Sequence, residues 1–92
     1  MNTTESAALL TQCRDMSQLC WEQAANDPRD ESSAAEFIAA WDAAQTGYDV
    51  AIVAIAEGRI PDAIDVLTET ARLEREYGDD QHARRALAAV QS

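Results

Sequence analysis

Apolar side chains recur at helical spacing from the third residue of the chain. Over Thr3–Ala25 they fall three or four positions apart, and the charged residues lie largely off this stripe. The pattern predicts a first helix over residues 3–25. The residues that we expect it to bury are Leu9, Cys13, Met16 and Cys20, with Leu10 and Trp21 widening the stripe.

A polar segment, NDPRDESS over residues 26–33, separates this helix from the next apolar run. Ser33 and Glu36 have the spacing of a capping box, so we expect the second helix to begin near Ala34. Steps of three and four continue through Gly47, so two alternatives stay open: a long helix that the glycine weakens, and a helix that breaks there. Its expected buried residues are Phe37, Trp41, Ala44, Tyr48, Ile52 and Ile55.

The stretch AEGRIPDAI, residues 56–64, marks a tight connection between two helices. Gly58 is suited to the left-handed conformation that ends a helix, and Pro61 is suited to a first helical turn, where its missing N–H has no helical partner. These two residues predict an antiparallel hairpin. The third helix should bury apolar residues on one face and end at Gly78. That face comprises Ala63, Ile64, Leu67, Ala71 and Tyr77.

A short last helix is expected after Gly78, with Asp79 or Asp80 as its cap. Its inward residues are Ala83, Leu87 and Val90. The 92-residue chain is 47% hydrophobic, much of that alanine, and holds only three glycines and two prolines. Such a composition favours helices over strands. We therefore predict an all-α fold, a single domain over 1–92 that forms a compact antiparallel bundle of three main helices plus a short C-terminal helix.

The segment VAIVAIA, Val50–Ala56, is apolar around the whole helix. A helix of this kind has to be enclosed. It therefore lies at the centre of the fold or forms a homodimer interface, for which the candidate residues are Ile52, Val53 and Ile55.

Charge restricts the kinds of partner. Seventeen acidic residues face seven basic ones, all arginine, and the formal net charge is −10. This charge repels nucleic acid and anionic membranes, so a partner that recognises it should be basic. The first fifteen residues contain neither a basic leader nor a long apolar run, so we expect no signal peptide, no membrane span and a cytoplasmic location.

Residue types that support catalysis or metal binding are sparse. Cys13 and Cys20 lie seven positions apart, about 10 Å along a helix, which is beyond disulfide reach, so both are expected to be reduced thiols. His82 is the single histidine, and beside Asp79 and Asp80 it fits an exposed helix start better than a metal site. The sequence has no recognisable nucleophile with a base and no glycine-rich phosphate loop. We expect a protein that is not an enzyme and that has no cofactor or metal.

Acidic residues gather in two places. One set lies on the outer face of the third helix, interrupted by Arg72: Asp62, Asp65, Glu69 and Glu76. The other set lies around the polar segment: Asp27, Asp30, Glu31 and Glu36. Steps of three and four residues rise about 4.5 and 6 Å along a helix, which is comparable with one or two phosphate steps of about 3.4 Å on a DNA strand. The two interpretations are a partner-binding surface that mimics nucleic acid and an acidic surface that keeps a small protein soluble.

The chain also bears two resemblances to known kinds of protein. The predicted hairpin resembles one tetratricopeptide unit, with Ala51 and Ala63 at the small positions, Gly58 at the turn and Leu67 at the large apolar position. In size, acidity and helical make-up, the whole chain resembles small phage anti-defence proteins, including anti-CRISPR proteins. The second resemblance implies a non-enzymatic inhibitor that occupies a basic surface of its target, such as a nucleic-acid-binding surface. The alternative is a homodimeric helical-hairpin adaptor.

Overall fold

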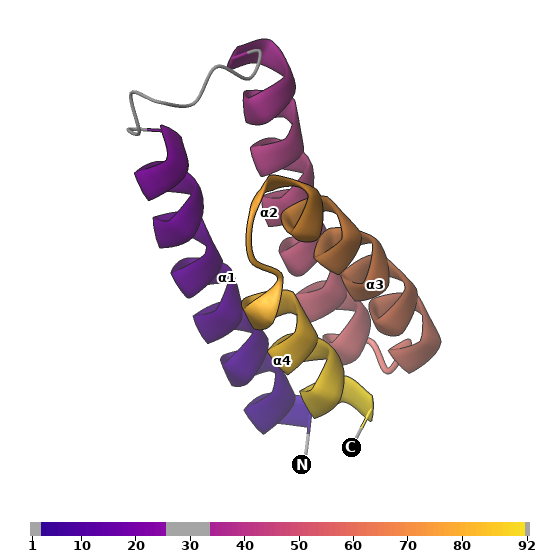
Figure 1. Ribbon diagram of the computed structural model, residues 1–92. Coiled ribbons are helices and arrows are strands. Elements are labelled where there is room, and N and C mark those ends of the chain that lie inside the picture. The colour runs from indigo at the N-terminus through magenta and orange to yellow at the C-terminus, as the bar shows by residue number, and fades with distance from the viewer. Residues whose placement is uncertain (1–2, 26–33, 92) are drawn as a thin grey trace.

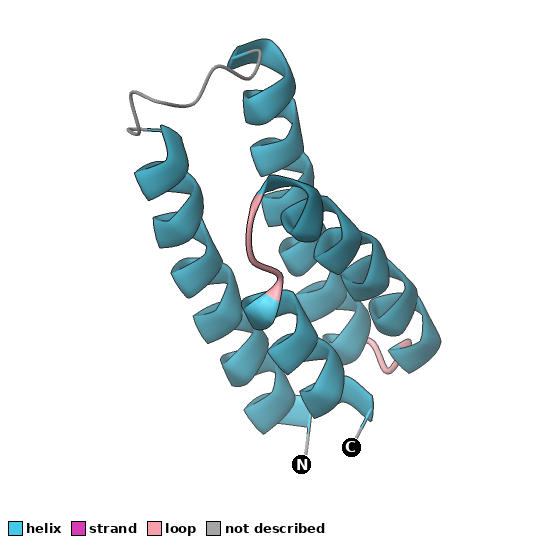
Figure 2. Ribbon diagram, viewed as in Figure 1, coloured by secondary structure: helices cyan, strands magenta, loops and turns pink. Residues whose placement is uncertain are grey.

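The computed structural model describes residues 3–25 and 34–91, which form four helices (Figure 1). These are α1 (Thr3–Ala25), α2 (Ala34–Ala56), α3 (Ile60–Tyr77) and α4 (Gln81–Gln91). Within this part of the chain all regular structure is helical, and two short links connect the last three helices (Figure 2). The all-α prediction is confirmed. The predicted segment 26–33, with Asp27, Asp30 and Glu31, lies outside the described residues.

The helices pack as neighbours around a shared core. Figure 1 shows the chain running along α1, returning along α2, turning into α3, and ending with α4 between α1 and α3. α2 packs against both α1 and α3, and α4 packs against the same two helices from the other side. None of the helices in the described part of the chain combines the length and hydropathy required to span a membrane.

The hairpin between α2 and α3 forms because of local backbone preferences. Gly58 has φ 79°, and its N–H donates to the Ile55 carbonyl at 3.0 Å, while the Arg59 N–H donates to the Ala54 carbonyl at 2.7 Å. This pair of hydrogen bonds is the Schellman motif, which satisfies carbonyls at the end of a helix. Pro61 lies in the first turn of α3. The predicted connection is therefore confirmed.

Gly47 does not interrupt α2, and it lies at a close contact between α2 and α3. A Cβ atom at this position would overlap the hydroxyl oxygen of Thr70 and would lie 3.6 Å from Cγ1 of Val66. Thr70 is itself 2% exposed, and its hydroxyl donates to the Val66 carbonyl at 3.0 Å. The missing side chain of Gly47 thus allows the two helices to come together.

The buried side chains form two groups. The larger group joins all four helices and is rich in alanine. The smaller group lies where α1 meets the first half of α2 and is aromatic: the ring centroids of Trp21 and Phe37 are 5.3 Å apart, and those of Trp21 and Tyr77 are 5.6 Å apart. The aromatic residues thus contribute mainly to the core, although Trp41 is only half buried.

The predicted buried face of α1 is partly wrong. Met16 is 43% exposed and Cys20 is exposed, whereas Cys13 is buried as expected. The residues that α1 buries are Ser6, Leu10, Cys13, Ser17 and Trp21. Two serines occupy core positions here, so the face that α1 directs into the core is not its most apolar face.

The apolar segment 50–56 is not enclosed on all sides by this chain. Ala51, Ala54 and Ile55 are buried, but Val50 is 41% and Val53 is 53% exposed. Ile55, at 1% exposure, belongs to the core of the protomer and is not available as an interface residue. Ile52 is half buried, which leaves Val53 as the accessible member of the predicted interface set.

Candidate protein-interaction site

The outward face of α2 carries apolar and acidic side chains together. Ile38 is 60% exposed, and it shares this face with the exposed valines of the same helix and with two aspartates. We refer to this surface as the α2 ridge, which consists of Ile38, Asp42, Thr46, Asp49, Val50 and Val53. Val50 and Val53 lie one turn apart on this face, whereas Ile38 lies about 18 Å from Val50 along the helix. Exposed apolar side chains that adjoin one another, as the two valines do, are typical of contact surfaces.

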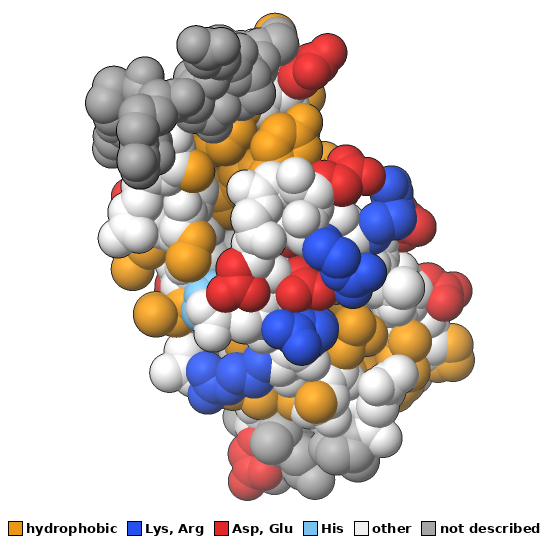
Figure 3. Space-filling model, viewed as in Figure 1, with side chains coloured by type: hydrophobic (Ala, Val, Ile, Leu, Met, Phe, Trp, Pro, Cys, Tyr) orange, Lys and Arg blue, Asp and Glu red, His pale blue; other side chains and the backbone are white. Residues whose placement is uncertain are grey.

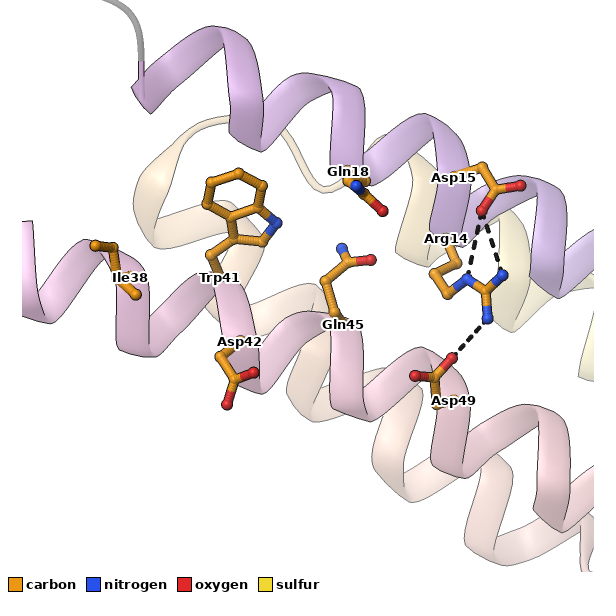
Figure 4. Close-up of a pocket in the computed structure, with 8 residues that line it drawn as sticks. All are labelled: Arg14, Asp15, Gln18, Ile38, Trp41, Asp42, Gln45 and Asp49. Carbon is orange, nitrogen blue, oxygen red and sulfur yellow. Dashed lines mark hydrogen bonds and ion pairs between the residues drawn. The ribbon is translucent and has the colours of Figure 1, made fainter.

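A cleft of about 490 Å³ between α1 and α2 flanks one side of the ridge (Figure 4). Arg14 of α1 reaches across it to Asp49, with 2.7 Å between Nη1 and Oδ1, and also contacts Asp15 at 3.4 Å. The Gln18 and Gln45 side chains extend into the space between the helices, where Nε2 of Gln45 is buried and has no hydrogen-bond partner among the described residues. The cleft therefore combines polar side chains with the apolar Ile38 and Trp41, and the arginine that lines it is already paired.

A groove of about 580 Å³ between α2 and α3 flanks the other side of the ridge. Its lining is mostly small or apolar, and acidic side chains lie among these residues. We call it the α2/α3 groove, and it is lined by Asp42, Ala43, Thr46, Gly47, Val50, Asp65, Val66, Glu69, Thr70 and Leu73. Asp42 lines both the groove and the cleft, so this residue lies between the two hollows.

The predicted acidic residues of α3 are all exposed, but most of them are paired with arginine. Arg59 contacts Asp62 at 3.0 Å, and Arg72 contacts both Glu69 and Glu76 at 3.0 Å. Asp65 has no ion pair or hydrogen bond within the described part of the chain. Exposed pairs of this kind still leave side chains accessible, but they reduce the negative potential that a count of acids suggests. Glu36, the described member of the second predicted patch, is exposed.

Acids and arginines also alternate over the link between α3 and α4. Figure 3 shows red and blue side chains interleaved on this face. Asp80, predicted as a cap, is 8% exposed and contacts Arg75 and Arg84, each at 3.0 Å. Burial favours a higher pKa for Asp80, but the hydrogen bond from Arg75 and the charge of Arg84 outweigh it and lower the pKa. The capping role belongs to Asp79, whose Oδ1 accepts from the Gln81 N–H at 3.0 Å.

A buried polar network joins three helices, and no sequence pattern had pointed to it. Ser17 of α1 and Tyr48 of α2 both donate to Oε1 of Glu74 on α3, at 2.9 and 2.7 Å. Glu74 is 4% exposed, and burial raises its pKa despite these two hydrogen bonds. Burial and the neighbouring Glu74 also raise the pKa of Tyr48, so its hydroxyl stays protonated and serves as a donor.

The two cysteines differ in environment, and both are free thiols. Burial raises the pKa of Cys13, which lies in the larger core group. Cys20 is exposed, and its sulfur lies 3.6 Å from Nε2 of His82. Within residues 3–25 and 34–91, no three histidine, cysteine or acidic side chains come together in a way that could hold a metal ion.

Comparisons of the chain with models of protein families, with curated proteins and with solved structures find no match. Function is therefore inferred from the geometry of the α2 ridge and of the hollows on either side of it.

Proposed function

We propose that the protein is a non-enzymatic acidic interaction protein that binds a basic, partly apolar surface of a target protein. The α2 ridge and the α2/α3 groove would make the contact, on a scaffold that we infer to be a compact antiparallel bundle of three main helices and a short fourth. By occupying a surface that otherwise holds nucleic acid, the protein would act as an inhibitor, as phage anti-defence proteins do. A cytoplasmic location is part of this proposal.

The proposed binding function rests on one observation: exposed apolar side chains lie near carboxylates that form no ion pair with arginine. Ile38, Val50 and Val53 are 60, 41 and 53% exposed. Val50 lines the α2/α3 groove together with Asp42 and Asp65, and Ile38 lines the neighbouring cleft together with Asp42. Neither Asp42 nor Asp65 has an ion pair among the described residues. Apolar contact contributes affinity, and the acids select for a basic partner and speed its association.

The test compares two double charge reversals that change the net charge equally. Asp42→Lys with Asp65→Lys alters the groove, while Glu36→Lys with Glu76→Lys alters acids outside it. The immobilised protein is used to capture partners from cells at several salt concentrations, and each captured protein is then purified and assayed for displacement of its nucleic acid. We expect the groove reversal to abolish both capture and displacement, and the control reversal to reduce them only modestly. Equal losses in both variants would assign binding to overall acidity, and unchanged binding of the groove variant at low salt would refute the proposal.

The exposed valines also support the second candidate function, a homodimeric adaptor. Self-association through Val50 and Val53 would cover the part of the apolar segment that the protomer leaves exposed. Light scattering should then show a dimer that Val53→Asp converts to a folded monomer. A wild-type monomer at high micromolar concentration would exclude this candidate.

A further inference from the structure

A second, smaller pocket lies away from the α2 ridge, between α1 and the end of α3. Its volume is about 190 Å³. We call it the Glu74 pocket, and the lining residues that matter here are Cys20, Trp21, Ala24, Glu74, Tyr77 and Asp79. It combines aromatic rings from two helices with a buried carboxyl group.

The charge of Glu74 is not balanced by any basic side chain. Ser17 and Tyr48 supply neutral hydroxyl donors, and both bonds end on Oε1. Within residues 3–25 and 34–91, no ion pair reaches Glu74 and no donor reaches Oε2. The charged groups that act on it are Asp80 and Asp79, and both have the same sign as the carboxylate. A buried carboxylate is costly unless a cation accompanies it, so the pocket favours a positively charged occupant.

The pocket walls suit a particular kind of cation. Trp21 and Tyr77, whose ring centroids are 5.6 Å apart, provide aromatic surface for alkyl groups and attract ammonium groups through their ring electrons. Asp79 adds a further carboxylate to the lining. A flexible alkyl chain that ends in a primary ammonium group matches this combination of apolar walls and a buried acid.

We propose that the Glu74 pocket is a binding site for a primary alkylammonium group. A lysine side chain of a partner protein and a free alkyl amine share this chemistry. The site does not depend on the function proposed above, because none of its lining residues belongs to the α2 ridge or the α2/α3 groove.

The test titrates n-butylammonium into isotope-labelled protein at pH 8, because a rise in pH shifts Glu74 toward its carboxylate form, and follows the indole N–H signal of Trp21 by NMR. Trp41→Phe removes the only other indole signal and so assigns it. We expect a saturable shift with n-butylammonium and none with n-butanol, which has the same chain without the charge. Nα-acetyl-lysine methylamide is titrated in parallel: tighter binding than n-butylammonium assigns the site to a protein lysine, and weaker binding assigns it to free amines.

Two variants test the residues. Glu74→Gln should weaken n-butylammonium binding about tenfold or more, whereas Glu76→Gln, the same change on the exposed face of the same helix, should leave it unchanged. Ala24→Leu retains Glu74 but places a larger side chain in the pocket, and it should abolish n-butylammonium binding. This variant keeps the test decisive if Glu74→Gln does not fold. The proposal is overturned if the wild type shows no saturable shift, if n-butanol binds equally well, or if both pocket variants bind as the wild type does.

Discussion

Replacement of Gly47 by alanine tests the close contact of this residue with Thr70, where α2 meets α3. In an exposed helix interior this change is stabilising, because glycine has more backbone freedom to lose, and the gain is about 1 kcal/mol. Here the new methyl group would overlap the Thr70 hydroxyl oxygen. To relieve the overlap, Thr70 has to rotate and lose its 3.0 Å hydrogen bond to the Val66 carbonyl, or the helices have to separate.

The expected magnitude follows from these opposing effects. Overpacking of a tight contact costs about 1–3 kcal/mol, which exceeds or cancels the helical gain, so Gly47→Ala should lower the free energy of unfolding by up to about 2 kcal/mol. In a Thr70→Ala background the obstructing oxygen is gone, and the same change should stabilise by about 1 kcal/mol. The sign of the effect should therefore reverse between the two backgrounds.

Urea unfolding followed by circular dichroism, carried out on both single variants and the double variant, measures this coupling. Thr70→Val is the matched control, since it keeps the volume of Thr70 but not its hydroxyl, and Gly47→Ala should remain destabilising in that background. If Gly47→Ala stabilises the protein by the same amount in every background, the helices do not approach each other as described.

Three further predictions concern stability: its dependence on pH through Glu74, and the effects of replacing Tyr48 and Gly58. Because burial raises the pKa of Glu74, the folded state holds this proton more tightly than the unfolded chain does. The free energy of unfolding should therefore fall as pH rises from the ordinary glutamate pKa of about 4.3 through the raised value, and Glu74→Gln should remove this component in urea titrations at several pH values. Tyr48→Phe deletes a donor to a buried carboxyl group and should cost about 1–3 kcal/mol in the same unfolding assay, whereas Thr68→Ala, at an exposed hydroxyl, should change little. Gly58→Ala places a side chain at φ 79° and should destabilise the hairpin by about 1 kcal/mol, and an unchanged melting temperature would contradict the left-handed turn.

The helix limits could be read from the sequence because they depend on local backbone chemistry. Gly58, Pro61 and Gly78 act through their own conformational preferences, and the structure ends or starts helices at these residues as predicted. The spacing of apolar residues on either side of Gly47 did not decide between a weakened and a broken helix, and the structure shows α2 to be continuous there.

The residues that α1 buries could not be predicted from local sequence. Hydropathy favoured Met16 and Cys20, but Ser17 takes the buried position because its partner, Glu74, lies 57 residues away in the sequence. A pairing over this distance leaves no trace in local periodicity.

The acidic face of α3 was predicted only in part. Exposure of its acids was predicted correctly, but the ion pairs of Arg72 with Glu69 and Glu76, three and four residues away, were not part of the prediction. The α2/α3 groove was not foreseen, because its lining residues come from two helices, with Asp42 on α2 and Asp65 on α3.

The sharing of one Glu74 oxygen by Ser17 and Tyr48 has a consequence for how this sequence can change over time. Replacement of Glu74 by an apolar residue removes the acceptor of both hydroxyls, and replacement of Ser17 or Tyr48 removes one of the two donors to a buried carboxyl group, so each single step lowers stability. An apolar core of similar volume would require three coordinated substitutions on three helices, with unstable intermediates along the way. Stepwise substitution therefore does not readily convert this core into an apolar one, although the two sequences would differ at only three positions.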